Sequence, residues 1–200
     1  MYKYIRKNSF ERIVEKITQF DWLFFILICM LICIGLLTIH TVDNANTNYL
    51  FKHFLRISFS LLLFLIVAFI NIKFWYRFSY IFYLVIVGLL FYVDFFGLST
   101  LGAQRWINLY FFTIQPSELM KVGVILALAR YYQYIKLEEI DRFSKLIIPI
   151  FIIVIPFFLV ASQPDLGTAI FILVVCVGML WLAGLSLKFF ITSFFSLLII

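Results

Sequence analysis

The sequence has few charged residues, few prolines and few cysteines. Only 13% of its 200 residues are charged and 65% are hydrophobic, whereas about a quarter of the residues of a soluble domain are charged. The mean hydropathy of +1.11 comes from long apolar runs rather than from scattered core residues. This composition excludes disordered, fibrous and nucleic-acid-binding proteins. It indicates a protein that resides in a membrane.

The three cysteines, Cys29, Cys33 and Cys176, all lie inside apolar runs. A cysteine in such a run most simply acts as a small buried hydrophobic residue, so the sequence implies no disulfide framework. Cys29 and Cys33 share one helical face, a spacing that could hold a metal, but no histidine or acid lies beside them in that run.

Because a spanning helix needs about 20 predominantly apolar residues, the apolar runs predict the transmembrane segments. We expect an all-α, polytopic membrane protein with about seven spans. The last run is still apolar at Ile200 after about 12 residues, too few to cross the hydrocarbon core, so we expect this span to be cut off. A re-entrant or interfacial terminus is the alternative. The predicted spans are residues 22–39, 54–70, 79–96, 118–132, 146–161, 167–185 and 189–200.

The positions of lysine and arginine predict the orientation in the membrane. The segment before the first span and the second, fourth and sixth connections together hold most of the 16 basic residues. The opposite side holds Lys52, Arg56, Arg105 and Lys121. The positive-inside rule therefore predicts a cytoplasmic N-terminus. Residues 1–21 carry an apolar stripe at helical spacing that ends at Phe20, which predicts an amphipathic segment on the cytoplasmic leaflet rather than a secretory leader.

Two polar segments interrupt the apolar pattern, and both fall on the predicted outer side. In the first, GAQRWINLYFFTIQPSELMK, Pro116 is placed to open a helix. Glu118 and Lys121 then lie three residues apart on one helical face. A charge at membrane depth costs about 2.5 to 3.5 kcal/mol, so we expect both to face the bundle or a wet cavity. A simple intrahelical ion pair is the alternative.

The second polar segment is SQPDLGT at residues 162–168. Asp165 could cap the following helix. It could also converge with Arg105, Glu118 and Lys121 on a shared cavity, where two cations would suit an anionic headgroup such as a diphosphate, with or without a divalent metal. The candidate substrate-binding residues are Arg105, Trp106, Gln115, Ser117, Glu118, Lys121, Gln163 and Asp165.

At these two segments the sequence resembles the SEDS family (shape, elongation, division and sporulation), typified by RodA, FtsW and SpoVE. The motifs GAQRWIN, QPSELMK and QPDLGTA occur in the family's order and separation. Their QRW and PDLG forms look more like RodA, the elongation member, than FtsW, the division member. The resemblance covers the chain from the first span onward, so residues 22–200 are expected to form the N-terminal half of a SEDS-type transmembrane bundle.

The resemblance implies a peptidoglycan glycosyltransferase in the bacterial cytoplasmic membrane. Such an enzyme polymerises lipid II during cell elongation and cell-shape maintenance, with a class B penicillin-binding protein and other elongation-complex membrane proteins as partners and no nucleic acid. Arg105 and Lys121 would stabilise the diphosphate leaving group. Glu118 would hold Lys121, Gln115 and Ser117 would bind polar headgroup atoms, and Gln163 and Asp165 would shape the site.

The family's catalytic aspartate falls beyond Ile200, so no catalytic residue is expected within these residues and the 200 residues alone are expected to be inactive. Two other functions remain open. One is a transporter that moves a lipid-linked precursor across the bilayer, and the other is an inactive scaffold that binds a penicillin-binding protein.

Overall fold

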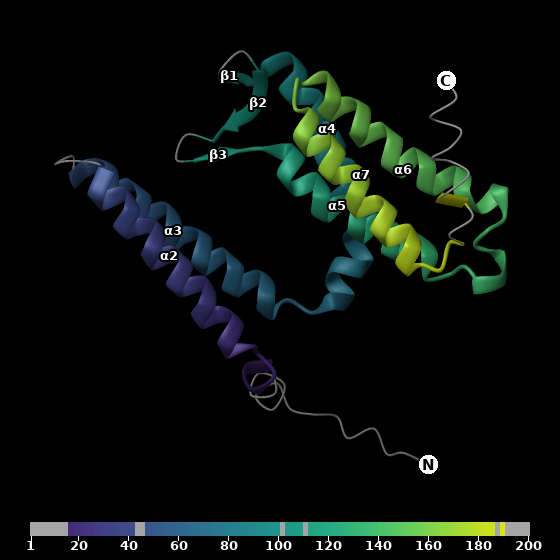
Figure 1. Cartoon of the computed structure of the whole chain (residues 1–200), viewed down its shortest axis with the longest axis horizontal. Helices are drawn as coiled ribbons and strands as arrows, with labels where there is room; N and C mark the ends of the chain where they lie inside the picture. The colour runs from purple at the N-terminus through teal and green to yellow at the C-terminus, as the bar shows by residue number, and fades with distance from the viewer. Residues whose placement is uncertain (1–15, 43–46, 101–102, 110–111, 187–188, 191–200) are drawn as a thin grey trace. The chain divides into compact units, whose positions relative to one another are not determined.

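The structure is a computed structural model that describes residues 16–42, 47–100, 103–109, 112–186 and 189–190 (Figure 1). The chain divides into two compact units, residues 1–70 and residues 71–200. The first unit contains helices α2 (Trp22–Val42) and α3 (Thr47–Phe69). The second contains strands β1 (Leu98–Thr100), β2 (Ala103–Asn108) and β3 (Thr113–Ile114), helices α4 (Ile72–Phe96), α5 (Pro116–Tyr132), α6 (Phe143–Ser162) and α7 (Leu166–Leu182), and the short 3-10 helix η1 (Leu137–Glu139).

Six of the predicted spans coincide with helices, which confirms the all-α polytopic fold. Within the described residues, four helices are long and apolar enough to cross a membrane: α2, α3, α4 and α6. Helices α5 and α7 have 17 residues each, a length of about 25 Å. The seventh predicted span falls mostly outside the described residues, as does most of the amphipathic segment predicted before the first span.

In the first unit, α2 and α3 pack side by side through aromatic rings near one end of the pair. The ring of Phe20 stacks on that of Phe69, with 5.8 Å between centroids, and Phe25 stacks on Phe64 at 6.3 Å. Asp21 begins α2, because its carboxylate accepts a hydrogen bond from the Phe24 amide at 2.9 Å. Most of the remaining surface of both helices is apolar and exposed, as expected of helices that contact lipid, while the exposed Lys52 and Arg56 lie near the start of α3.

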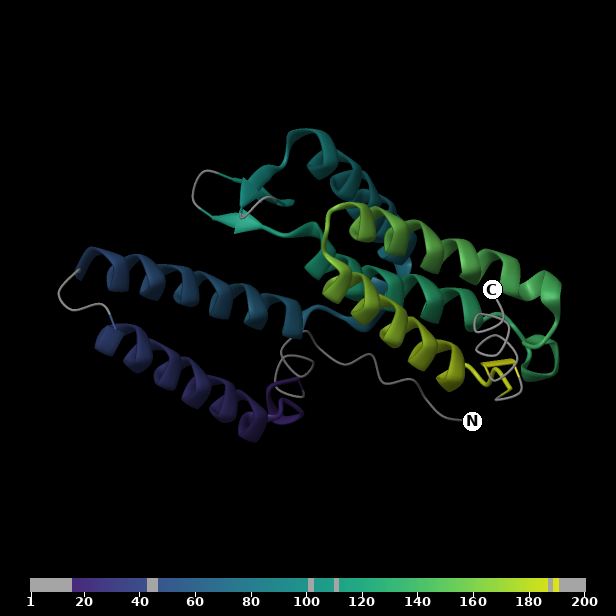
Figure 2. The same cartoon turned by 45° about the horizontal axis from the view of Figure 1, so that its top comes forward.

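In the second unit, helices α4 to α7 pack together around one hydrophobic core, and Figure 2 shows α5, α6 and α7 side by side. Helix α4 buries Tyr83, Ile86, Leu90 and Val93, whose alternating spacing of three and four residues forms one stripe. A methyl group added at Gly123 of α5 would lie 3.1 Å from Cδ1 of Ile86. Glycine therefore allows the close approach of α4 and α5.

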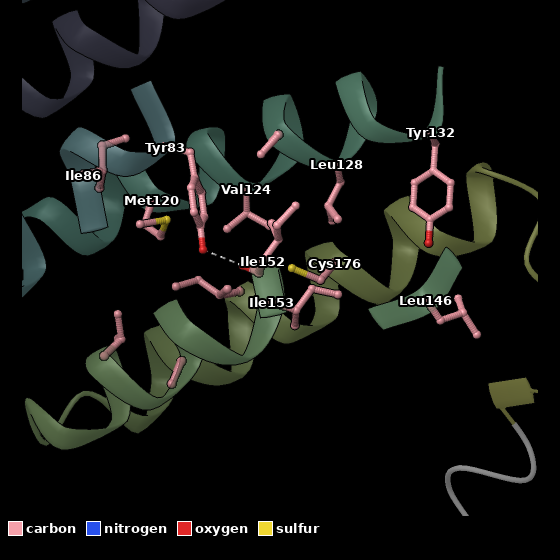
Figure 3. Close-up of a cluster of buried hydrophobic side chains, with 14 of the residues drawn as sticks. Tyr83, Ile86, Met120, Val124, Leu128, Tyr132, Leu146, Ile152, Ile153 and Cys176 are labelled. Atoms are coloured by element: carbon pink, nitrogen blue, oxygen red, sulfur yellow. Dashed lines mark hydrogen bonds between the residues drawn. The ribbon is translucent and has the colours of Figure 1, made fainter. Parts of the chain in front are cut away.

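Two prolines inside α6, Pro149 and Pro156, each lack the amide that would bond the carbonyl four residues earlier. Tyrosines of neighbouring helices replace the missing donors. The Tyr83 hydroxyl of α4 donates to the Ile152 carbonyl at 3.1 Å (Figure 3), and the Tyr131 hydroxyl of α5 donates to the Lys145 carbonyl at 3.0 Å. Both freed carbonyls are thus satisfied within the bundle, as a spanning helix requires.

The long connection between α4 and α5 forms a small antiparallel sheet, with β2 in the middle. The apolar pattern of the sequence did not predict these strands. The sheet positions the basic residue Arg105, because Leu98 of β1 pairs with Trp106 and Ile114 of β3 pairs with Ile107. It leads directly through Gln115 into the first turn of α5.

Candidate functional site

The two polar segments meet at one end of the second unit, where β2, the start of α5 and the turn between α6 and α7 lie together. Arg105 extends from β2 across that turn. Its Nε donates to the Gln163 carbonyl at 3.2 Å, and its Nη2 donates to the Pro164 carbonyl. Its Nη1 lies 3.8 Å from an oxygen of Asp165. One guanidinium therefore contacts three consecutive residues.

Asp165 joins the turn to the start of two helices. One carboxylate oxygen accepts a hydrogen bond from the Thr168 amide at 3.4 Å, which caps α7. The other accepts from Nε2 of Gln115, the residue that precedes α5, at 3.1 Å. The carboxylate is nearly buried, with 11% of the side chain exposed. The predicted capping role and the predicted proximity to Arg105 therefore both occur.

Gln163 anchors the same turn to α4. Its side chain is buried, and its Nε2 donates to the Leu90 carbonyl at 3.0 Å. The residue thus binds the turn through its side chain while its own carbonyl accepts from Arg105. This contact with α4 was not predicted, because no sequence signal marks a backbone carbonyl of an apolar helix as an acceptor.

Glu118 and Lys121 form an ion pair on α5, with 2.7 Å between Oε2 and Nζ. The predicted pairing on one helical face is present. The Glu118 side chain is 55% exposed and that of Lys121 is 23% exposed. The ammonium of Lys121 also lies 4.9 Å from the ring centroid of Phe171 on α7, a cation–π contact that the sequence did not indicate.

The two remaining candidate residues lie close by in the chain but take no part in these polar contacts. Trp106 is half-buried on β2 next to Arg105, and Ser117 is buried in the first turn of α5. The structure therefore joins Arg105, Gln115, Gln163 and Asp165 in one network, which we call the turn network. Glu118 and Lys121 form a separate pair one helical turn further along α5.

Each cation of the site already has a carboxylate partner, which limits what the site can bind. Among the described residues, no three histidine, cysteine or acidic side chains gather as a metal site would require. Asp165 is also committed to Arg105, Gln115 and the α7 cap. Of the two cations, Lys121 has the more exposed carboxylate partner, since Glu118 is 55% exposed and Asp165 is 11% exposed.

Charged residues at helix starts within a bundle of apolar helices are typical of a polytopic membrane protein. Residues 18–200 match the FtsW, RodA and SpoVE family model, described as a cell cycle protein. The chain belongs to this family, as its resemblance to SEDS proteins implies.

The chain is similar to the peptidoglycan glycosyltransferase MrdB of Helicobacter pylori, with 35% identity over 187 residues. The match covers 90% of this chain and 48% of the relative, so the chain spans about half the length of the curated relatives it matches. Other similar proteins are named RodA or probable peptidoglycan glycosyltransferase FtsW. The names therefore include both RodA and FtsW proteins.

Two solved structures share the fold. The rod shape determining protein RodA of Thermus thermophilus superposes with a TM-score of 0.76 at 24% identity, covering 90% of this chain and 59% of that one. A chain from a peptidoglycan synthase complex, described as coordinating polymerization and crosslinking, superposes with a TM-score of 0.78 at 25% identity. That match covers 90% of this chain and 52% of the other.

Proposed function

We propose that this chain forms the N-terminal part of a peptidoglycan glycosyltransferase that polymerises lipid II during cell elongation and cell-shape maintenance. Family membership and the name of the MrdB relative support the activity. The observation that carries the proposal is the arrangement of the site. A turn network fixed by Arg105 joins the starts of α5 and α7, and one helical turn further along α5 Lys121 has the exposed Glu118 as its one ion-pair partner among the described residues.

In lipid II polymerisation a sugar hydroxyl attacks the anomeric carbon and an undecaprenyl diphosphate leaves. The reaction needs a base for the hydroxyl and positive charge for the leaving diphosphate. Lys121 supplies that charge in our proposal, because an ion pair to an exposed carboxylate is worth about 0 to 1 kcal/mol and is easily exchanged. The resemblance places the base in a later part of the family's sequence.

The turn network has a positioning role in this proposal. Arg105 is held by two backbone carbonyls and Asp165, so its guanidinium has less freedom than Lys121 to follow a substrate. Gln115, Gln163 and Asp165 fix the starts of α5 and α7, and thereby the distance between Lys121 and Phe171. Trp106, half-buried beside Arg105, lines the approach to the headgroup in this proposal, whereas Ser117 is buried in the first turn of α5.

We further propose that the site faces outward from the bacterial cytoplasmic membrane and that the N-terminus is cytoplasmic. The opposite end of the second unit supports this orientation. Arg130 lies there, within hydrogen-bond distance of the Arg77 carbonyl, and Lys145 lies near Tyr131, so several basic residues gather at one end. A class B penicillin-binding protein is the proposed partner, supported by the similar chain from a complex that coordinates polymerization and crosslinking.

The test is polymerisation of fluorescent lipid II by the whole protein with its penicillin-binding protein partner. Loss of a charge-assisted hydrogen bond worth about 1.5 to 3 kcal/mol predicts that Lys121→Ala slows polymerisation by about 10- to 100-fold. Lys121→Arg should retain part of the activity because it keeps the charge. The matched control is Lys52→Ala, which removes an exposed lysine of the first unit and should leave the rate unchanged.

Normal polymerisation by Lys121→Ala would contradict the assignment of Lys121. Movement of lipid II across liposome membranes without any polymer would instead favour a transporter. Copurification with the penicillin-binding protein, with neither polymer nor transport, would favour a scaffold.

A further inference from the structure

A group of aromatic and basic side chains lies at the end of the second unit opposite to the site. It consists of Tyr76, Arg77 and Tyr80 in the first turns of α4, Arg130 in the last turn of α5, and Tyr134 just after α5. We call it the Arg130 cluster. The proposed glycosyltransferase chemistry does not use any of these residues.

Arg130 is held in one orientation by its neighbours. The guanidinium carbon lies 4.6 Å from the ring centroid of Tyr80 and 5.3 Å from that of Tyr76. One terminal nitrogen, Nη1, donates to the carbonyls of Tyr76 and Arg77, at 3.2 and 2.6 Å. Arginine has five N–H donors, and within the described residues these two bonds use Nη1 alone.

The other edge of the guanidinium, formed by Nε and Nη2, is the fork that binds phosphate in a bidentate manner. Two hydroxyl groups belong to the same cluster, where the Tyr76 hydroxyl donates a hydrogen bond to the Tyr134 hydroxyl. The Tyr134 residue is 77% exposed. The cluster therefore presents oriented phosphate donors at an accessible position.

The positive charge of the cluster also lacks a counter-charge. The three ion pairs between described residues are Arg105 with Asp165, Lys121 with Glu118 and Arg142 with Glu139. None involves Arg77, Arg130 or Lys73, which lies one helical turn before Arg77. These residues lie at the end of a membrane-spanning helix, where anionic lipid headgroups supply negative charge.

We propose that the Arg130 cluster binds the phosphodiester of an acidic phospholipid such as phosphatidylglycerol. Arg130 binds two phosphate oxygens, and Arg77 adds a second positive charge. Tyr134, whose hydroxyl accepts from that of Tyr76, donates its own hydroxyl hydrogen to the phosphate. The bound lipid completes the contact between the start of α4 and the end of α5, which Arg130 already joins.

The test is native mass spectrometry of the full chain in micelles with equal amounts of phosphatidylglycerol and phosphatidylcholine. Since each basic residue near an anionic headgroup contributes about 1 kcal/mol, roughly fivefold in affinity, we expect at least a fivefold excess of phosphatidylglycerol adduct. Arg77→Gln should reduce that excess by about fivefold. Arg130→Lys, which keeps the charge but lacks the fork, should also reduce it.

The matched control is Arg142→Gln, a basic residue at the same end that already pairs with Glu139, and its adduct ratio should equal that of the parent chain. An equal drop in Arg142→Gln and Arg77→Gln would indicate diffuse surface charge and overturn the proposal. So would displacement of the lipid by inorganic phosphate at tenfold excess. If Arg130→Lys does not fold, Tyr134→Phe tests the same site, because its exposed ring leaves the packing intact.

Discussion

The hydrogen bond between Tyr83 and the Ile152 carbonyl gives a sharp test of how the prolines of α6 are tolerated. Tyr83→Phe removes the hydroxyl and leaves the ring in the core, so the carbonyl that Pro156 leaves free loses its donor. The structure predicts that this loss matters only while Pro156 is present. In a Pro156→Ala background the restored amide bonds the same carbonyl.

The size of the expected loss of stability depends on whether the Ile152 carbonyl keeps a hydrogen-bond donor. A buried acceptor without a donor costs about 1 to 3 kcal/mol, while hydrogen bonds between helices in membranes average about 0.6 kcal/mol. We therefore expect Tyr83→Phe to lower the free energy of unfolding by about 1 to 2 kcal/mol. In the Pro156→Ala background the same change should cost less than about 0.5 kcal/mol, which gives a coupling energy near 1 kcal/mol.

Unfolding of the four chains by sodium dodecyl sulfate in mixed micelles, followed by far-ultraviolet circular dichroism, measures both differences. Tyr92→Phe is the matched control, because it removes a hydroxyl from an exposed tyrosine of the same helix, and it should change the free energy by under about 0.3 kcal/mol. A cost for Tyr83→Phe that is equal in both backgrounds would refute the reasoning, since the hydroxyl would then stabilise the fold independently of the proline.

Two further predictions concern the packing of α5 and its start. Gly123→Leu should destabilise the chain by about 1 to 3 kcal/mol, because the added atoms meet Ile86, whereas Gly88→Leu, which faces open space, should have little effect in the same unfolding assay. Gln115→Glu places a second carboxylate beside Asp165 and should destabilise the chain by about 1 to 2 kcal/mol at neutral pH. Gln133→Glu at the exposed end of α5 is the matched control, and an effect equal to that of Gln115→Glu would contradict the prediction.

The sequence predicts the helices well because a membrane span is specified by local composition. Six of the apolar runs are helices in the structure. Most of the helix ends lie within a few residues of the predicted ends. The starts of α3 and α4 differ most: α3 begins at Thr47 rather than Phe54, and α4 begins at Ile72 rather than Ser79. Because of Lys73 and Arg77, the sequence predicts a connection for the first turns of α4. Their side chains are long enough to place the charge at the surface while the backbone stays helical.

The site is predicted only in part, because its contacts join residues far apart in the chain. The pairing of Glu118 with Lys121 follows from helical spacing, and the cap formed by Asp165 follows from its position before a helix. By contrast, the position of Arg105 depends on the small sheet, and its hydrogen bonds to the turn after α6 need tertiary structure. The cation–π contact of Lys121 with Phe171 has no signal in the sequence.

Side chains that donate to backbone carbonyls join the elements of the second unit. Tyr83 and Tyr131 bind α6, Gln163 binds α4, Arg105 binds the turn after α6, and Arg130 binds α4. In lipid such bonds and close packing replace the hydrophobic effect, which does not drive one apolar helix against another. A cation that binds backbone carbonyls in this way has a structural role in the protein.

Lys121 differs from these residues because its ammonium contacts a side-chain carboxylate and an aromatic face rather than a backbone carbonyl. In the proposed function, Lys121 would exchange the Glu118 carboxylate for a diphosphate, which breaks no hydrogen bond to the backbone. Replacing Arg105 should therefore lower both stability and activity, whereas replacing Lys121 should lower activity with little change in unfolding. Measuring polymerisation and unfolding on the same two variants separates the cation that holds the site from the cation that serves the substrate.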